Sequence, residues 1–334
     1  MFPRDLIYRS DLFFDSAGFS ISDGAKTMKV LITGGTGFIG RALTARLARD
    51  GHEVTIVTRS FRRAEEYGPG ESRISYLQGN PVERGPWQTG LESQDVIINL
   101  AGASIFSKWS AKQKKRIRGS RLNTTLNIVE GLPPTPGKPL TLISASAVGY
   151  YGFHGDEELD EHSLPGDDFL AGICREWEAE ALKAAAKNVR VILTRFGIVL
   201  GEKEGALSLM ARLFKLFVGG PLGSGKQWFS WIHLGDLTEA IAFLIDNPEI
   251  SGPVNLCAPN PVRNKVLAET LGNALHRPSF FRAPAFMVRL VLGEFGTVIL
   301  KGQRVIPRAL IDHGFIFGYP ELSEALREIQ TKKR

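Results

Sequence analysis

The fold of this chain is decided near its start, in the stretch Lys29-Val30-Leu31-Ile32-Thr33-Gly34-Gly35-Thr36-Gly37-Phe38-Ile39-Gly40. Residues 29–33 are an apolar run that predicts a buried strand, and helical character begins at Phe38. Gly34 allows a tight turn, Gly37 lets backbone approach a pyrophosphate, and Gly40 lets the helix pack closely on the strand. The free N–H groups at the helix N-terminus favour phosphates. The stretch therefore predicts a dinucleotide-binding turn, with an ordinary tight turn as the alternative.

The end of the second predicted strand indicates which dinucleotide is bound. NAD enzymes usually carry Asp or Glu there for the ribose hydroxyls. This chain has Thr58-Arg59-Ser60, followed by Arg62 and Arg63. A guanidinium can pair with a 2′-phosphate through two hydrogen bonds, and no carboxylate repels it. We therefore expect NADP; the alternative is that Arg59 is a solvated loop residue.

Strand and helix patterns alternate along the rest of the chain. Strands are predicted at 29–33, 53–58, 73–77, 95–100, 140–146 and 189–194, and helices at 38–49, 111–129, 169–187, 236–246, 262–275, 284–293 and 320–329. Strands separated by helices form parallel βαβ units. The expected fold is α/β, a Rossmann-like doubly wound parallel sheet with a smaller, mostly helical C-terminal domain. We expect an N-terminal extension at 1–27, an NADP-binding domain at 28–200, and a substrate-side domain at 201–334 interleaved with the sheet.

Composition narrows the class of protein. The chain has 334 residues, is 43% hydrophobic and contains two cysteines, too few for a disulfide framework or a zinc site. No apolar run reaches the length of a membrane span. The formal charge of +6 is modest, and a basic stripe also suits a phosphorylated cofactor. We expect a cytoplasmic protein with a small-molecule substrate, no metal, no nucleic-acid or membrane partner, and a homo-oligomeric state left open.

Several motifs resemble the extended short-chain dehydrogenase/reductase superfamily. They are Thr33–Gly40, Asn99-Leu100-Ala101-Gly102, Ser144–Gly152 and Trp231–Asp236. Further stretches look like the atypical NADP-binding epimerase-family proteins of that superfamily: Gly119-Ser120-Arg121, Gly166–Leu170, Trp177-Glu178, Arg195–Gly201 and Gly302–Pro307. The resemblance spans nearly everything from Met28 onward.

The resemblance implies a set of cofactor contacts in addition to the turn. Leu100, Ala101 and Gly102 would run beside the cofactor, and Val199 would lie near the nicotinamide. Arg121 would lie near the phosphate or adenosine side. The complete expected set is Gly34, Thr36, Gly37, Phe38, Ile39, Gly40, Thr58, Arg59, Leu100, Ala101, Gly102, Arg116, Arg121, Ser144 and Val199. Arg116 is included because it lies on the basic helix, within reach of a phosphate.

The usual catalytic pair of the superfamily is missing from this chain. The family uses Ser or Thr with a Tyr and a Lys four residues apart on one helix face. None of the tyrosines here has a lysine four positions later, and the expected pair falls at Leu170 and Cys174. Ser146 stands where the family has Ser or Thr.

Two interpretations follow. In the first, the chain is an NADP-dependent oxidoreductase or epimerase with a rebuilt acid–base set drawn from Ser146, Tyr150 and Tyr151. In the second, it binds NADP without turnover, as a redox sensor or regulatory module. Aromatic packing is the alternative role for the two tyrosines.

Two other features have open or structural interpretations. The loop 219–228 is glycine-rich and ends in Lys226-Gln227-Trp228, so it predicts either substrate contact or a linker. His233 and Asp236 look like a catalytic pair, but we expect Asp236 to cap a helix and His233 to pack at the domain junction.

Overall fold

The computed structural model describes residues 27–61, 73–202 and 204–331. The expected N-terminal extension, apart from residue 27, lies outside this part, as do Arg62 and Arg63. Among the described residues, no helix combines the length and the apolar character needed to cross a membrane.

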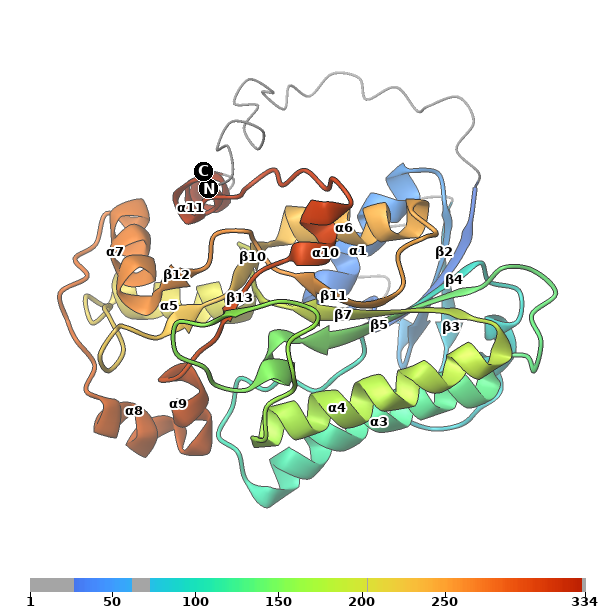
Figure 1. Cartoon of the computed structure of the whole chain (residues 1–334), viewed down its shortest axis with the longest axis horizontal. Coiled ribbons are helices and arrows are strands. Elements are labelled where there is room, and N and C mark those ends of the chain that lie inside the picture. Colours follow the sequence, from blue (N-terminus) through green and yellow to red (C-terminus); the bar gives the residue numbers. More distant parts are fainter. Residues whose placement is uncertain (1–26, 62–72, 203, 332–334) are drawn as a thin grey trace.

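The centre of the molecule is a seven-stranded sheet in the order β11-β7-β5-β4-β1-β2-β3, with every neighbouring pair parallel (Figure 1). Its strands are β1 (Lys29–Thr33), β2 (Glu53–Thr58), β3 (Ile74–Gln78), β4 (Val96–Asn99), β5 (Thr141–Ala147), β7 (Arg190–Phe196) and β11 (Gly252–Leu256). β-Branched residues fill these strands, as is typical of a sheet buried on both faces. The Rossmann-like fold expected from the sequence is confirmed.

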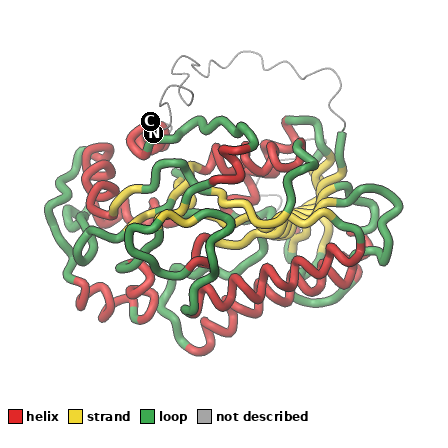
Figure 2. The backbone as a smooth tube through the Cα atoms, in the orientation of Figure 1, coloured by secondary structure: helices red, strands yellow, loops and turns green. Residues whose placement is uncertain are grey.

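Helices cover both faces of the sheet (Figure 2). On one face lie α1 (Phe38–Arg49) and α6 (Leu234–Asp246), which pack against each other and form a core with the strands. The other face carries α3 (Ala111–Gly131) and α4 (Phe169–Leu182), which also lie side by side. β1 thus leads into a helix on one face and β4 into a helix on the other.

The second half of the chain both completes the sheet and builds a helical unit. β11 pairs with β7, and α6 covers the sheet, so residues 234–256 belong to the Rossmann-like layer. A separate core joins α5 (Gly205–Lys215), α7 (Asn264–Leu275) and α11 (Leu322–Thr331). α8 (Ala285–Leu292) and α9 (Glu294–Ile299) form a short pair, and α10 (Arg308–Asp312) follows. The remaining strands are β6 (Glu158–Leu159), β8 (Ile198–Leu200), β9 (Trp228–Phe229), β10 (Trp231–His233), β12 (Val262–Arg263) and β13 (Arg304–Val305).

Some local predictions differ from the structure. The sequence prediction does not include α5, α9, α10 and β11, of which the last three span only five or six residues. Asp236 does not cap α6: the His233 ring nitrogen Nδ1 accepts from Gly235 N at 3.1 Å and caps it instead. The Asp236 carboxylate accepts from Gly318 N and Tyr319 N, at 2.9 and 3.0 Å, and burial raises its pKa to about 6. The His233 ring packs on the Tyr319 ring at 4.1 Å between centroids.

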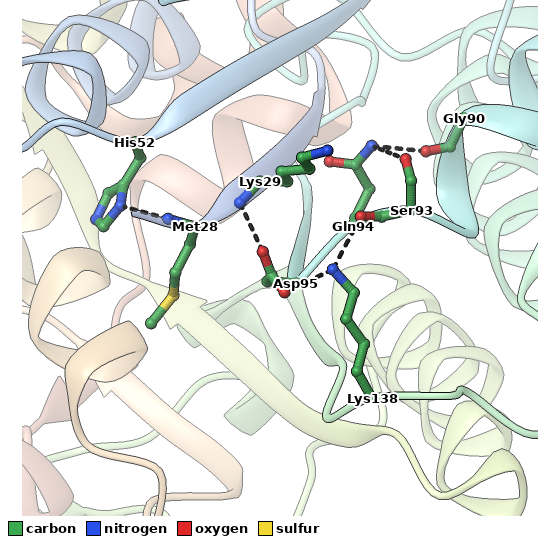
Figure 3. Close-up of polar contacts among 8 residues, drawn as sticks. All are labelled: Met28, Lys29, His52, Gly90, Ser93, Gln94, Asp95 and Lys138. Atoms are coloured by element: carbon green, nitrogen blue, oxygen red, sulfur yellow. Dashed lines mark hydrogen bonds and ion pairs between the residues drawn. The ribbon is translucent and has the colours of Figure 1, made fainter. Parts of the chain in front are cut away.

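The amino edge of the sheet is fastened by polar side chains (Figure 3). Lys29 N donates to Asp95 Oδ2 at 2.7 Å, and Lys138 Nζ donates to Asp95 Oδ1 at 2.6 Å. Met28 N donates to His52 Nδ1 at 3.3 Å. These bonds tie the starts of β1, β2, β4 and β5 together, on the side away from the glycine turn.

Candidate functional site

The sheet topology places a crevice between the carboxyl ends of β1 and β4. The chain runs from β1 outward through β2 to β3, and then returns to β4 on the other side of β1. The connecting helices therefore diverge to opposite faces at this point, and ligands of open α/β sheets bind in the crevice so formed.

The glycine turn lies at this switch point. Gly34 has φ +77°, and a Cβ placed on it would lie 2.8 Å from the Leu100 carbonyl carbon, so only glycine fits here. A Cβ on Gly40 would lie 2.3 Å from Gly34 O. Gly37 differs: within 4 Å, among the described residues, its Cβ would meet only Gly34 O, at 3.2 Å. Gly37 is also the N-cap of α1, which no side chain caps. The turn thus offers bare backbone N–H groups to an anion.

Neighbours of the turn anchor it to the second half of the chain. The Phe38 ring fits against Gly201 and Gly205, whose Cβ atoms would lie 2.6 and 3.2 Å from it. Arg41 donates to the Thr36 carbonyl oxygen at 2.9 Å, and Ile39 packs against the sheet core.

The end of β2 presents a guanidinium to the same edge. The buried Thr58 hydroxyl donates to Ser60 O at 3.1 Å and accepts from Ser60 N at 3.3 Å, which shapes the turn after β2. Arg59, within this turn, is exposed and makes no ion pair with any described residue. Its charge is therefore available to a ligand.

Beyond β4, residues Leu100–Gly102 lead to Arg121, a half-buried arginine. Leu100 N donates to Thr33 O at 3.0 Å, which holds this segment beside the turn. A Cβ on Gly102 would lie 3.2 Å from Arg121 Cζ. Arg121 NH1 donates to Ala103 O at 3.1 Å and to Ile117 O at 3.0 Å, and burial lowers its pKa.

Arg121 forms no ion pair within the described structure, and its electrostatic neighbour is Cys174 of α4. The guanidinium therefore lies between the segment after β4 and α4, and its place on the phosphate or adenosine side of a cofactor, implied by the resemblance, stays a prediction. Arg116 is exposed on α3 and makes no hydrogen bond or ion pair with a described residue, so its contact with a phosphate stays a prediction.

A buried polar network holds the β1 and β4 ends to α3 and α4. Thr33 Oγ1 donates to Asn99 Oδ1, Asn99 Nδ2 donates to Thr125 Oγ1, and Trp177 Nε1 donates to the same Thr125 oxygen, each at 2.8 Å. Ser144 is also fully buried, and its Oγ has no hydrogen-bond partner in the described chain. The sheet covers this hydroxyl, which gives it no exposed surface toward the crevice.

The position of the missing catalytic pair lies on the inner face of α4. Leu170 is beside Gly149, whose Cβ would lie 3.5 Å from Leu170 Cβ. Cys174 is buried and unpaired, and burial raises the pKa of its thiol to about 12. A hydrogen bond with Ser146 acts in the opposite direction on that pKa. Neither residue can replace the tyrosine and lysine at neutral pH.

Ser146 belongs to a buried ionic network that sequence reasoning missed. Ser146 Oγ donates to Glu178 Oε1 at 2.6 Å. Arg195 clamps the same carboxylate with Nε at 2.9 Å and NH2 at 2.8 Å. Arg195 NH1 donates to the Tyr151 hydroxyl at 3.0 Å, which donates to Asn255 Oδ1 at 2.7 Å. A charged residue within the apolar strand Val-Ile-Leu-Thr-Arg-Phe was a signal that a buried partner exists.

The two candidate tyrosines have different surroundings. Tyr151 is fully buried, its hydroxyl has two partners, and burial raises its pKa. Tyr150 is only half-buried; its ring lies 3.5 Å from Arg195 Cζ, and its hydroxyl makes no hydrogen bond with a described residue. Val199 lies on β8, and a Cβ placed on Gly205 would lie 3.4 Å from Val199 O. Of the two phenols, Tyr150 is the one free to meet a ligand.

The fold and this site define a Rossmann-like α/β protein with a glycine-rich turn at the switch point of its sheet. The chain belongs to the NAD dependent epimerase/dehydratase family, whose model matches residues 30–257. A second model, a domain of unknown function named DUF1731, matches residues 283–329.

Similar proteins cover nearly the whole chain. A chloroplastic epimerase family protein SDR39U1 homolog of Arabidopsis thaliana is 44% identical, over 90% of this chain and 86% of its own length. Epimerase family protein YfhF of Bacillus subtilis is 41% identical, over 92% of this chain and 99% of its own. The crystal structure of human epimerase family protein SDR39U1 (isoform2) with NADPH superposes with a TM-score of 0.80 at 36% identity, covering 91% of this chain and 99% of that one.

Proposed function

We propose that the protein is an NADP(H)-dependent oxidoreductase or epimerase in which Tyr150 takes the place of the usual Tyr-x-x-x-Lys pair. The observations that carry the cofactor assignment are the uncapped N-terminus of α1 at the switch point and the exposed Arg59, which makes no ion pair with a described residue. The human relative solved with NADPH supports the same cofactor. The two unpaired cysteines support a reducing compartment such as the cytoplasm.

The residues of the turn would bind the pyrophosphate through backbone N–H groups and the α1 dipole. Arg59 would pair with the 2′-phosphate. Arg121 has spare donors beside Gly102 and would meet the nicotinamide half, where its charge lacks a carboxylate partner.

In a reduction, bound NADPH would supply a hydride to the carbonyl carbon of the substrate, whose C=O π bond breaks. Tyr150 would donate its phenolic proton to the carbonyl oxygen and regain a proton from solvent. Ser146 would not donate a proton to the substrate, because its hydroxyl already donates to Glu178. It would instead hold the end of β5 and the following turn, which carries Tyr150, in place. Tyr151 would have a structural role, because its hydroxyl is buried and already hydrogen-bonded.

The second candidate function is NADP binding without turnover. The observation favouring it is the replacement of the catalytic pair by Leu170 and by a Cys174 thiol whose pKa is raised to about 12. Such a protein would report the NADP redox state through its conformation or its partners.

Single-turnover kinetics with NADPH and a panel of carbonyl compounds would separate the two. We expect hydride transfer in the parent protein, and a loss of about a hundredfold or more in Tyr150→Phe, with NADPH affinity unchanged. Tyr151→Phe is the matched control: it should lower stability while leaving the rate per folded molecule intact. Tight NADPH binding without oxidation by any compound of the panel would favour the sensor.

A further inference from the structure

An apolar cluster stands at the carboxyl edge of the sheet, next to the proposed reacting groups. We call it the apolar wall; it consists of Phe106, Trp109, Phe169, Leu170, Leu292 and Phe295. The Trp109 ring centroid lies 5.2 Å from that of Phe169 and 5.6 Å from that of Phe295. Phe106 meets Phe295 edge-on at 5.9 Å and remains 41% exposed. The loop after β4, the start of α4 and the α8–α9 pair each contribute to it.

The wall reaches the point at which chemistry is proposed. Leu170 packs against Gly149, which lies between Ser146 and Tyr150. It is also the residue that occupies the position of the family's tyrosine. Leu170, in place of a phenol, therefore lies beside the turn that carries Ser146 and Tyr150, and it packs against the aromatic rings of the wall.

The polar groups of the wall are already paired. Trp109 Nε1 donates to Ile105 O at 3.0 Å. Lys114 Nζ lies 4.6 Å from the Phe169 ring centroid and donates to Glu294 Oε1 at 2.6 Å. A ligand with many hydroxyls would lose hydrogen bonds to water here without replacing them. An apolar ligand would lose none.

We propose that the wall receives an apolar carbonyl compound, aromatic or branched aliphatic, in place of the sugar part of a sugar nucleotide. This inference rests on the proposed function, because it assigns the substrate class of the same crevice. Leu292 and Phe295 come from residues 283–329, so the segment matched by the domain of unknown function would determine substrate specificity.

Prodan, a neutral aromatic ketone whose emission shifts to the blue in apolar surroundings, tests the proposal by binding alone. We expect a saturable blue shift with the NADP⁺-loaded protein that UDP-galactose does not reverse. Leu170→Asn should weaken prodan binding by about tenfold or more. Phe106→Asn should also weaken prodan binding. Phe106 is partly exposed, so this substitution leaves the core intact.

Leu290→Asn is the control, since Leu290 is 76% exposed on α8 and is not part of the wall. It should leave prodan binding unchanged; a larger loss there than in Leu170→Asn and Phe106→Asn would place the probe on the outer face of α8 and overturn the proposal. No prodan binding, or its displacement by UDP-galactose, would overturn it too. NADPH titration of the parent protein and of each variant distinguishes failure of this proposal from failure of the proposed function. If the parent protein did not bind NADPH, the proposed function would be refuted.

Discussion

At the amino edge of the sheet, polar groups bind one another, whereas at the carboxyl edge several of them have no partner in the described structure. Asp95 joins the backbone of β1 to Lys138, and His52 accepts from Met28 N (Figure 3). At the other edge, no side chain caps the α1 N-terminus, and Arg59 makes no ion pair with a described residue. Both edges belong to the same βαβ units, so the difference lies in side chains and not in topology.

This comparison separates residues that hold the fold from residues available to a ligand. The carboxyl edge has both kinds. The Glu178–Arg195 pair is buried, and its charged groups are bonded to each other. Arg59 and the α1 N-terminus, by contrast, are available to a ligand. Substitutions at the two edges should therefore have different effects on stability and on NADPH affinity.

The largest expected effect tests whether the buried Glu178–Arg195 ion pair stabilises the fold. Glu178→Gln removes the charge that compensates Arg195, whose side chain is 4% exposed. Leaving that guanidinium buried should cost about 3–5 kcal/mol of unfolding free energy, measured by urea denaturation. The control is Glu176→Gln on the same helix, whose exposed ion pair with Arg118 should contribute about 0–1 kcal/mol. Equal losses in the two variants would mean that the buried network does not hold this edge.

The second prediction compares two glycines with positive φ, one near each edge. Gly34 has φ +77° and a Cβ would meet Leu100 at 2.8 Å; Gly51, in the turn before β2, has φ +90° and no described atom within 4 Å of its Cβ. Gly34→Ala should cost about 2–4 kcal/mol, from backbone strain plus overpacking, and should abolish NADPH binding.

Gly51→Ala should cost only about 1–2 kcal/mol, from backbone strain alone, and should bind NADPH normally. Urea denaturation and NADPH fluorescence titration measure both quantities. If Gly34→Ala bound NADPH as the parent protein does, the turn would not be the pyrophosphate site.

The features predicted correctly from the sequence are those with local signals. The strand–turn–helix at Lys29–Arg49 follows from an apolar run and spaced glycines, and the parallel pairing of the strands follows from alternating periods. The role of Arg59 after β2 in selecting the dinucleotide, also drawn from local chemistry, stays a prediction. Such features depend on neighbours in the chain, so a single sequence contains them.

The features missed depend on contacts between distant segments. Ser146 was singled out, but its partner Glu178 is 32 residues away, and Arg195 lies on another strand. Asp236 was expected to cap a helix because of its position, whereas the 318–319 backbone, distant in sequence, binds its carboxylate. The apolar wall likewise depends on α9, whose short sequence carries no strong helix signal. No pattern in one segment reveals such pairings.

The smallest expected effects sharpen the comparison of the edges most directly. Arg59→Ala at the carboxyl edge should weaken NADPH binding by about 10–100-fold, the value of a charge-assisted hydrogen bond to a phosphate, without changing stability. NADH affinity should stay nearly constant, since NADH lacks the 2′-phosphate. Asp95→Asn at the amino edge should do the reverse, lowering stability by about 1–2 kcal/mol and leaving NADPH affinity intact, because its bonds to Lys29 N and Lys138 lie at the edge away from the glycine turn. Fluorescence titrations with both dinucleotides, together with urea denaturation, measure the four quantities. Equal losses of NADPH and NADH affinity in Arg59→Ala would show that Arg59 shapes the turn after β2 and does not read the 2′-phosphate.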